Sequence, residues 1–243
     1  MGNLIPSDID WVINEFLKKF LKIDILDYEK IESGGQGYTT IYIGDLNDLQ
    51  EDGLLSIGFE RVKDDLWIIE GFERDILNLK DILAPYFEDL EKELWAEAIN
   101  KRVDLDDAYR AKYGKSLFAT HYTIPKLVIK WYRKICVDEH TFNDFIQDLN
   151  KIFRESMPQN IRGKIEFLKT VGALRNREGH STIDPREINI SKEYISSIIG
   201  LESPKYWYHY VDLQISLIKD TINFLEKTNT EEGLPWMASQ LEN

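Results

Sequence analysis

The amino-acid sequence predicts a mainly α protein, α+β overall, in which an N-terminal helix and a small antiparallel β-meander precede an antiparallel helical bundle. Apolar residues recur at helical spacing through most of residues 120–228. Three short apolar runs lie earlier, between residues 38 and 69, and turn-forming residues separate them. With 243 residues, 43% of them hydrophobic, the chain can bury a sizeable core.

The N-terminal portion, residues 1–119, is expected to hold the strands. A first helix is expected over residues 7–21, where a serine N-cap precedes apolar residues at helical spacing. Residues 73–100 have the pattern of a long helix with a kink or break at Pro85, and the polar residues 101–119 are the expected connector between two halves. The expected strands are Tyr38–Ile43, Leu54–Phe59 and Leu66–Ile69.

Residues 120–228 are expected to form the helical bundle, and residues 229–243 a tail. Short polar breaks with N-cap residues or prolines mark where each helix begins. A longer polar break at 179–190 separates the third helix, which ends near Asn176, from the fourth. The expected starts, in chain order, are Thr123, Asp138, Pro158, Ser191 and Ser203.

The net charge of −13 is unevenly distributed along the chain. Residues 1–100 carry −14, whereas residues 101–134 carry +6 and residues 151–186 carry +4. The acidic composition therefore does not exclude a nucleic-acid partner, because these basic stretches are either phosphate-binding surfaces or solvated helix faces. The sequence has neither an apolar run of membrane-spanning length nor a secretion signal, so we expect a cytoplasmic protein with no membrane partner.

Several kinds of chemistry lack the residues they need. Cys136 is the single cysteine, which excludes an internal disulfide and a cysteine-based zinc site, and we expect it to pack in the core. No two of the four histidines lie at i, i+4 spacing, so we expect no metal and no cofactor. The glycine-rich segment Ser33–Tyr38 lacks the first glycine and the later motifs of a protein kinase, and is expected to be a flexible loop before a hairpin.

The most informative segment is Leu174–His180, which reads Leu-Arg-Asn-Arg-Glu-Gly-His. It places Arg175 in the last turn of an amphipathic helix and His180 five positions later. An arginine donates two parallel hydrogen bonds to a phosphate, and a histidine transfers protons near neutral pH. These two groups suffice for metal-free RNA cleavage, in which the ribose 2′-hydroxyl attacks the adjacent phosphorus. Asn176 is placed to orient the histidine or the phosphate.

This segment resembles the signature of the HEPN superfamily, in which an arginine, a polar residue and a histidine follow one another at short spacing. Members of the family are helical bundles, and many are endoribonucleases of toxin–antitoxin, abortive-infection and CRISPR defence systems. The resemblance covers about residues 120–228 and implies that Arg175, Asn176 and His180 form the catalytic site. Thr182 stands where some toxin members have a tyrosine, so regulation by modification of that tyrosine is not expected.

A second arginine–histidine pair, Arg133 and His140, has similar spacing. Its context differs, because Lys134 follows the arginine and the intervening Ile-Cys-Val is typical of core residues between two helices. We therefore assign the site to Arg175 and His180. A helix C-terminal cation and a loop histidine are the structural alternative for these two residues.

The predicted function is metal-independent cleavage of RNA that leaves a 2′,3′-cyclic phosphate. RNA is the expected partner, together with a second copy of the chain that completes a composite active site, and a protein antitoxin or regulator is a further candidate. Arg162, Lys164 and Lys169 are expected to border a shared basic cleft, and the aromatic residues 206–208 are either an interface anchor or core. The alternative function is a catalytically silent dimerisation or ligand-binding module.

Overall fold

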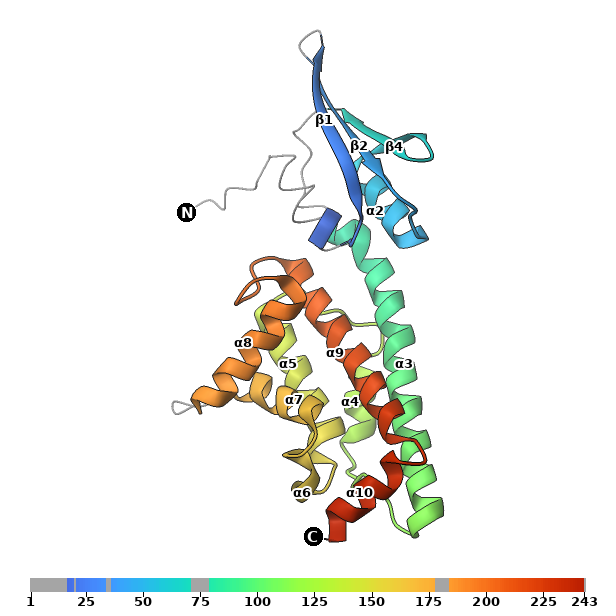
Figure 1. Cartoon of the computed structure of the whole chain (residues 1–243), viewed down its shortest axis with the longest axis vertical. Coiled ribbons are helices and arrows are strands. Elements are labelled where there is room, and N and C mark those ends of the chain that lie inside the picture. The colour runs from blue at the N-terminus through green and yellow to red at the C-terminus, as the bar shows by residue number, and fades with distance from the viewer. Residues whose placement is uncertain (1–16, 20, 34–35, 71–78, 178–183, 243) are drawn as a thin grey trace. The chain divides into compact units, whose positions relative to one another are not determined.

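The computed structural model describes residues 17–19, 21–33, 36–70, 79–177 and 184–242. The chain divides into two compact units, residues 1–86 and 87–243. Helices predominate, and the described strands form one four-stranded antiparallel sheet, which confirms the predicted mainly α class (Figure 1). Most of the helix expected over residues 7–21 lies outside the described residues.

The sheet of the N-terminal unit has the strand order β1-β2-β4-β3, with every neighbouring pair antiparallel. The paired residues Ser33 and Gln36 close the β1–β2 ladder, so the glycine-rich segment joins two strands instead of preceding a hairpin. Two of the expected strands, in β2 and β4, are confirmed. The strands are β1 (Ile25–Ser33), β2 (Gln36–Ile43), β3 (Glu60–Lys63) and β4 (Leu66–Glu70).

The strand expected at Leu54–Phe59 is wrong, and with it the simple meander. Helix α2 (Asp48–Ile57) occupies most of this run and separates β2 from β3. Asn47 and Gln50 form a reciprocal capping box at its start, and Gly58 ends it in the left-handed conformation at a φ of 92°. These capping interactions select a helix for a short apolar run whose periodicity fits either structure.

The connector expected at 101–119 is also wrong over most of its length. Helix α3 runs from Leu79 to Tyr113 and continues through Pro85 without a break. Its residues from Phe87 onward belong to the second unit, so the boundary between compact units falls at 86/87 instead of near 120. The reason is a buried stripe that the polar composition conceals, made of Trp95, Ala98, Leu105 and Tyr109.

The second unit is a helical bundle, whose helices appear from green to red in Figure 1. The N-cap expected at Asp138 is confirmed, because its carboxylate accepts a hydrogen bond from the backbone N–H of Thr141 at 2.7 Å. Beyond α3, the helices are α4 (Ile124–Lys130), α5 (Glu139–Leu149), the π-helical turn η3 (Asn150–Glu155), α6 (Gln159–Arg162), α7 (Glu166–Asn176), α8 (Pro185–Ile199), α9 (Trp207–Thr228) and α10 (Gly233–Glu242).

Several expected boundaries in the bundle need correction, and one is that of the last long helix, which begins at Trp207 instead of Ser203. The helix expected to run from Pro158 to Asn176 is interrupted between α6 and α7. The helix expected from Ser191 begins earlier, at Pro185, because Asp184 caps it by accepting a hydrogen bond from the Arg186 backbone N–H. The expected tail contains α10, which is folded because it contributes Leu234, Met237 and Ala238 to the buried core.

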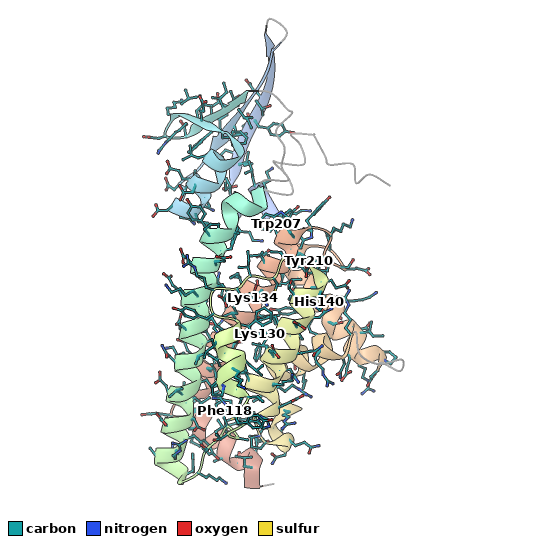
Figure 2. All side chains as sticks on the ribbon, turned by 180° about the vertical axis from the view of Figure 1, so that it is seen from behind. Phe118, Lys130, Lys134, His140, Trp207 and Tyr210 are labelled. Atoms are coloured by element: carbon teal, nitrogen blue, oxygen red, sulfur yellow. The ribbon has the colours of Figure 1, made fainter. Side chains whose placement is uncertain are left out.

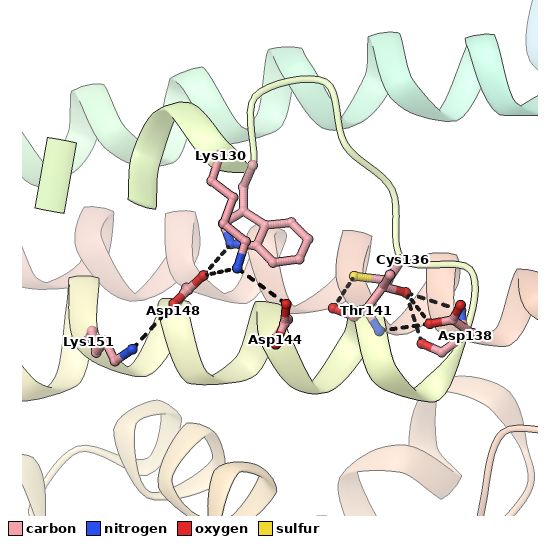
Figure 3. A network of polar contacts seen from close by, with 8 residues as sticks. Lys130, Cys136, Asp138, Thr141, Asp144, Asp148 and Lys151 are labelled. Atoms are coloured by element: carbon pink, nitrogen blue, oxygen red, sulfur yellow. Dashed lines mark hydrogen bonds and ion pairs between the residues drawn. The ribbon is translucent and has the colours of Figure 1, made fainter. Parts of the chain in front are cut away.

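A buried carboxylate joins α4 to α5 (Figure 3). Asp148 Oδ2 accepts hydrogen bonds from Trp131 Nε1 at 3.0 Å and from Lys130 Nζ at 2.7 Å, and Trp131 is fully buried. The amino groups of Lys130 and Lys134, labelled in Figure 2, both lie within 5.0 Å of the Trp131 ring centroid. Cys136 is buried nearby, which confirms its expected place in the core.

Glu91 of α3 is a second fully buried carboxylate. Its Oε2 accepts a hydrogen bond from the Lys134 backbone N–H at 3.1 Å, whereas its Oε1 has no hydrogen-bond partner. Burial raises the pKa of Glu91 to about 8, outweighing the backbone hydrogen bonds that lower it. The native state therefore binds this proton more tightly than the unfolded chain does. The resulting stabilisation is present at acidic pH and is lost as the pH rises toward about 8.

The substitution Glu91→Gln should remove this pH dependence, because the neutral amide does not ionise. The free energy of unfolding of the variant minus that of the wild type should rise between about pH 5 and pH 8 and then level off. The rise should amount to a few kcal/mol, since a pKa difference of one corresponds to about 1.4 kcal/mol. Urea unfolding across this pH range measures it, and a difference that stays constant with pH would contradict the assignment.

Candidate functional site

The last turn of α7 presents Arg175 and Asn176 at its surface. Leu168, Val171 and Leu174 bury the opposite face of this helix in the bundle core, which leaves the Arg175 side chain exposed. Its cationic position also suits the negative end of the helix dipole. The structure therefore places Arg175 where the amphipathic pattern predicts it.

Asn176 links Arg175 to the neighbouring helix. Its Oδ1 accepts a hydrogen bond from Arg175 Nη1 at 3.0 Å, and its Nδ2 donates to Glu187 Oε2 at 2.9 Å. Glu187 lies in the first turn of α8, which packs along α7. The asparagine thus orients the guanidinium directly and is itself held by a carboxylate on a second helix.

His180, the third expected site residue, lies outside the described residues. Its place in the chain is between the end of α7 at Asn176 and the start of α8 at Pro185. It is five positions after Arg175 in the sequence, which limits the distance between their α-carbons to about 18 Å. Its catalytic role remains a prediction.

Arg154 is a residue near the site that the sequence patterns do not single out. It lies on η3, which packs against α7, and a methyl group on the α-carbon of Gly172 would come within 2.9 Å of Arg154 Nε. Gly172 is three residues before Arg175 and four before Asn176, so the three positions share one side of α7. The net positive charge of residues 151–186 is the only signal in the sequence that includes Arg154.

The rejected pair, Arg133 and His140, has a different environment. The Arg133 guanidinium forms ion pairs with Asp89 at 3.0 Å and with Glu88 at 3.9 Å. The Arg133 backbone has a φ of 60°, a left-handed conformation that interrupts the helical chain between α4 and α5. His140, labelled in Figure 2, is exposed in the first turn of α5. The arginine of this pair is therefore already engaged in ion pairs with two carboxylates.

The other basic residues expected to border a cleft are each engaged within the chain. Arg162 donates from Nε to the Met157 carbonyl at 2.8 Å, and its Nη2 donates to the carbonyl of Glu155. Lys164 Nζ donates to Gln240 Oε1, and Lys169 Nζ pairs with Glu166 at 3.0 Å.

The aromatic residues 206–208 also pack within the bundle. Tyr208 is buried, and the Trp207 ring, labelled in Figure 2, lies edge-on to Phe87 with 6.4 Å between ring centroids. Core packing therefore accounts for Tyr208 and in part for Trp207. These contacts leave the expectation of a dimer interface at this place without a supporting observation.

No three histidine, cysteine, aspartate or glutamate side chains among the described residues come together as a metal site. Within the same ranges, none of the helices combines the length and the apolar character that crossing a membrane requires. Comparison with known proteins finds no matching family model, no matching curated protein and no matching solved structure.

The substitution Asn176→Ala should lower the free energy of unfolding by about 1–2 kcal/mol, because it removes a hydrogen bond to a charged carboxylate that joins α7 to α8. Urea denaturation measures this change. Asn223→Ala is the matched control: Asn223 is exposed on α9 and forms no side-chain hydrogen bond with any described residue. An equal effect of the two substitutions would mean that Asn176 does not hold the two helices together.

Proposed function

We propose that the protein is a metal-independent endoribonuclease of HEPN type, acting in the cytoplasm. The observation that carries the proposal is the exposed Arg175 guanidinium, which Asn176 orients and Glu187 anchors from the neighbouring helix. The sequence segment that contains His180 joins these same two helices. Arg175 therefore lies in the last turn of the helix that this segment follows in the chain.

The proposed reaction is an in-line transesterification. The ribose 2′-oxygen forms a bond to the adjacent phosphorus, and the bond from phosphorus to the 5′-oxygen breaks. The products are a 2′,3′-cyclic phosphate and a free 5′-hydroxyl. His180 takes the proton of the 2′-hydroxyl or delivers one to the departing 5′-oxygen, and Arg175 stabilises the negative charge that develops on the phosphorane.

Two protons must be transferred in this reaction, one from the 2′-hydroxyl and one to the 5′-oxygen. A single histidine is poorly placed to serve as the base for one and the acid for the other. A two-fold axis near the end of α7 would bring two copies of Arg175 and of His180 to one phosphate, because an isologous interface apposes the same patch of each subunit. We therefore infer a homodimer with a composite site. RNA is its substrate, and a protein antitoxin or regulator is a candidate partner.

Arg175→Ala should lower the rate of RNA cleavage by about 10²–10³-fold, and His180→Ala by about 10²–10⁴-fold. Arg175 is exposed, so its truncation should leave the circular dichroism spectrum unchanged, and we expect the same of His180→Ala. The assay is cleavage of a generic single-stranded RNA in EDTA. Wild-type activity in either variant would refute the assignment, and no cleavage by the wild type would favour the silent binding module.

Arg133→Ala and His140→Ala are the matched controls for these two variants. They remove the same side-chain types at similar spacing, but Arg133 is already paired with Asp89. RNA cleavage by both should stay within a few-fold of the wild type. A loss as large as that of His180→Ala, in folded protein, would mean that the other pair is the catalytic one.

The composite site predicts that the active species has twice the chain mass of 28.5 kDa in light scattering. It also predicts complementation. A mixed dimer of Arg175→Ala and His180→Ala subunits retains one Arg175 and one His180, and should recover part of the activity that each variant lacks alone. A monodisperse monomer with full, concentration-independent cleavage would contradict the composite site.

A further inference from the structure

Arg154 is an arginine without a partner in the described structure. Its Nε is buried and has no hydrogen-bond partner, and its guanidinium forms no ion pair with any described carboxylate. A guanidinium presents five N–H donors, and native structures rarely leave buried donors unpaired. An unpaired donor of this kind calls for a physical explanation, and a ligand that supplies the missing acceptor is one.

Arg162, on α6, is an arginine with a structural role and serves as a comparison. Its guanidinium donates hydrogen bonds to the carbonyl groups of Met157 and Glu155, where the chain leaves η3. Arg154 makes no such contact. A purely structural role for Arg154 therefore has no hydrogen bond to support it.

The position of Arg154 points to the Arg175 site. The absence of a side chain at Gly172 makes room for its guanidinium against α7, one turn before Arg175 and Asn176. Burial is the largest cause that lowers the pKa of Arg154, and repulsion from Arg162 and Arg175 lowers it further, whereas Glu155 and Glu187 raise it. Glu187 on α8 accepts a hydrogen bond from Asn176 through Oε2 and forms no ion pair with Arg154.

We propose that Arg154 is a second phosphate-binding residue of the Arg175 site, donating guanidinium N–H groups to the backbone phosphates of the bound RNA strand. A phosphate supplies non-bridging oxygens at the spacing of the guanidinium fork, and it would satisfy the unpaired donor. This inference rests on the proposed function, whose substrate-binding surface it extends from α7 to η3. Gly172 is then a residue that the binding surface requires.

The test uses an RNA oligonucleotide with a 2′-deoxy substitution at every position of cleavage, so that binding is measured without turnover. In fluorescence anisotropy, Arg154→Met should weaken binding tenfold or more and reduce the slope of log K against log salt by about 0.7, the value for one phosphate contact on a single strand. Arg154→Lys should keep most of the slope but recover only part of the affinity. Lys192→Met, which removes an exposed, ion-paired cation from α8, should change binding less than twofold.

Gly172→Ala tests the geometry while leaving every charge in place. The added methyl group displaces the Arg154 guanidinium, and alanine itself favours the helix. Gly172→Ala should therefore weaken RNA binding in the wild-type background and have no further effect in the Arg154→Met background. Additive effects of the two substitutions would contradict the proposed contact.

Stability separates a binding role from a structural one. Arg154→Met removes an unpaired buried donor, so its melting temperature should equal or exceed that of the wild type, and a lower one would overturn the inference. Equal RNA binding by wild type and variant would also overturn it, while leaving the proposed function intact. If the wild type binds no RNA, the proposed function fails, and thermal protection by inorganic pyrophosphate then decides: protection that Arg154→Met abolishes supports the anion site, and protection equal or absent in both refutes it.

Discussion

The π-helical turn over Asn150–Glu155 is the constraint on which the arrangement of the bundle depends. A π turn holds one residue more than an α turn, so it rotates the side chains that follow relative to those of α5. Ile152 and Phe153 lie in the core, whereas the next residue, Arg154, lies against Gly172 of α7. The Ile152 carbonyl accepts hydrogen bonds from Arg102 Nε at 3.2 Å and from Ser156 Oγ, which fixes the turn to α3.

Neighbouring contacts extend this constraint to the site. Arg102 lies over the ring of Phe118 with 4.3 Å from its guanidinium carbon to the ring centroid, and the Ser156 carbonyl accepts from the Ala119 backbone N–H. Arg162 then holds the carbonyls at the exit from η3. These contacts hold the chain in the turns that lead into α7. The proposed phosphate site would benefit from such contacts, because small misplacements of the binding groups are costly in rate.

Much of the bundle could be predicted from the sequence because its signals are local. The apolar spacing of Phe142, Phe145, Ile146 and Leu149 and the cap at Asp138 are enough to define α5. The N-terminal sheet was harder to predict. Strand β1 is rich in charged residues, which hides it from a search for apolar runs. The choice between strand and helix at Leu54–Phe59 depends on the N-cap at Asn47, which lies seven residues before this run. Helix α10 is stabilised by burial of its apolar residues against the bundle core, and no local sequence pattern predicts this contact.

The candidate site divides in the same way. The exposure of Arg175 and the adjacent Asn176 follow from helical periodicity, whereas the Asn176–Glu187 hydrogen bond requires α8 to begin at Pro185 instead of at Ser191. Arg154 could not be predicted, because its approach to Gly172 depends on the π turn and on the packing of η3 against α7. Residues that meet only through tertiary packing leave no spacing rule in the sequence.

The central claim is that the 2′-hydroxyl of the substrate is the nucleophile, activated without a metal by groups at the end of α7. Mass spectrometry of the fragments formed from a defined RNA in EDTA tests it most directly, with a matched oligonucleotide that carries a single 2′-deoxy nucleotide at the cleaved position. The account predicts fragments that end in a 2′,3′-cyclic phosphate and a 5′-hydroxyl, and no cleavage at the 2′-deoxy position. Fragments with 5′-phosphate ends, or equal cleavage of the 2′-deoxy oligonucleotide, would contradict it.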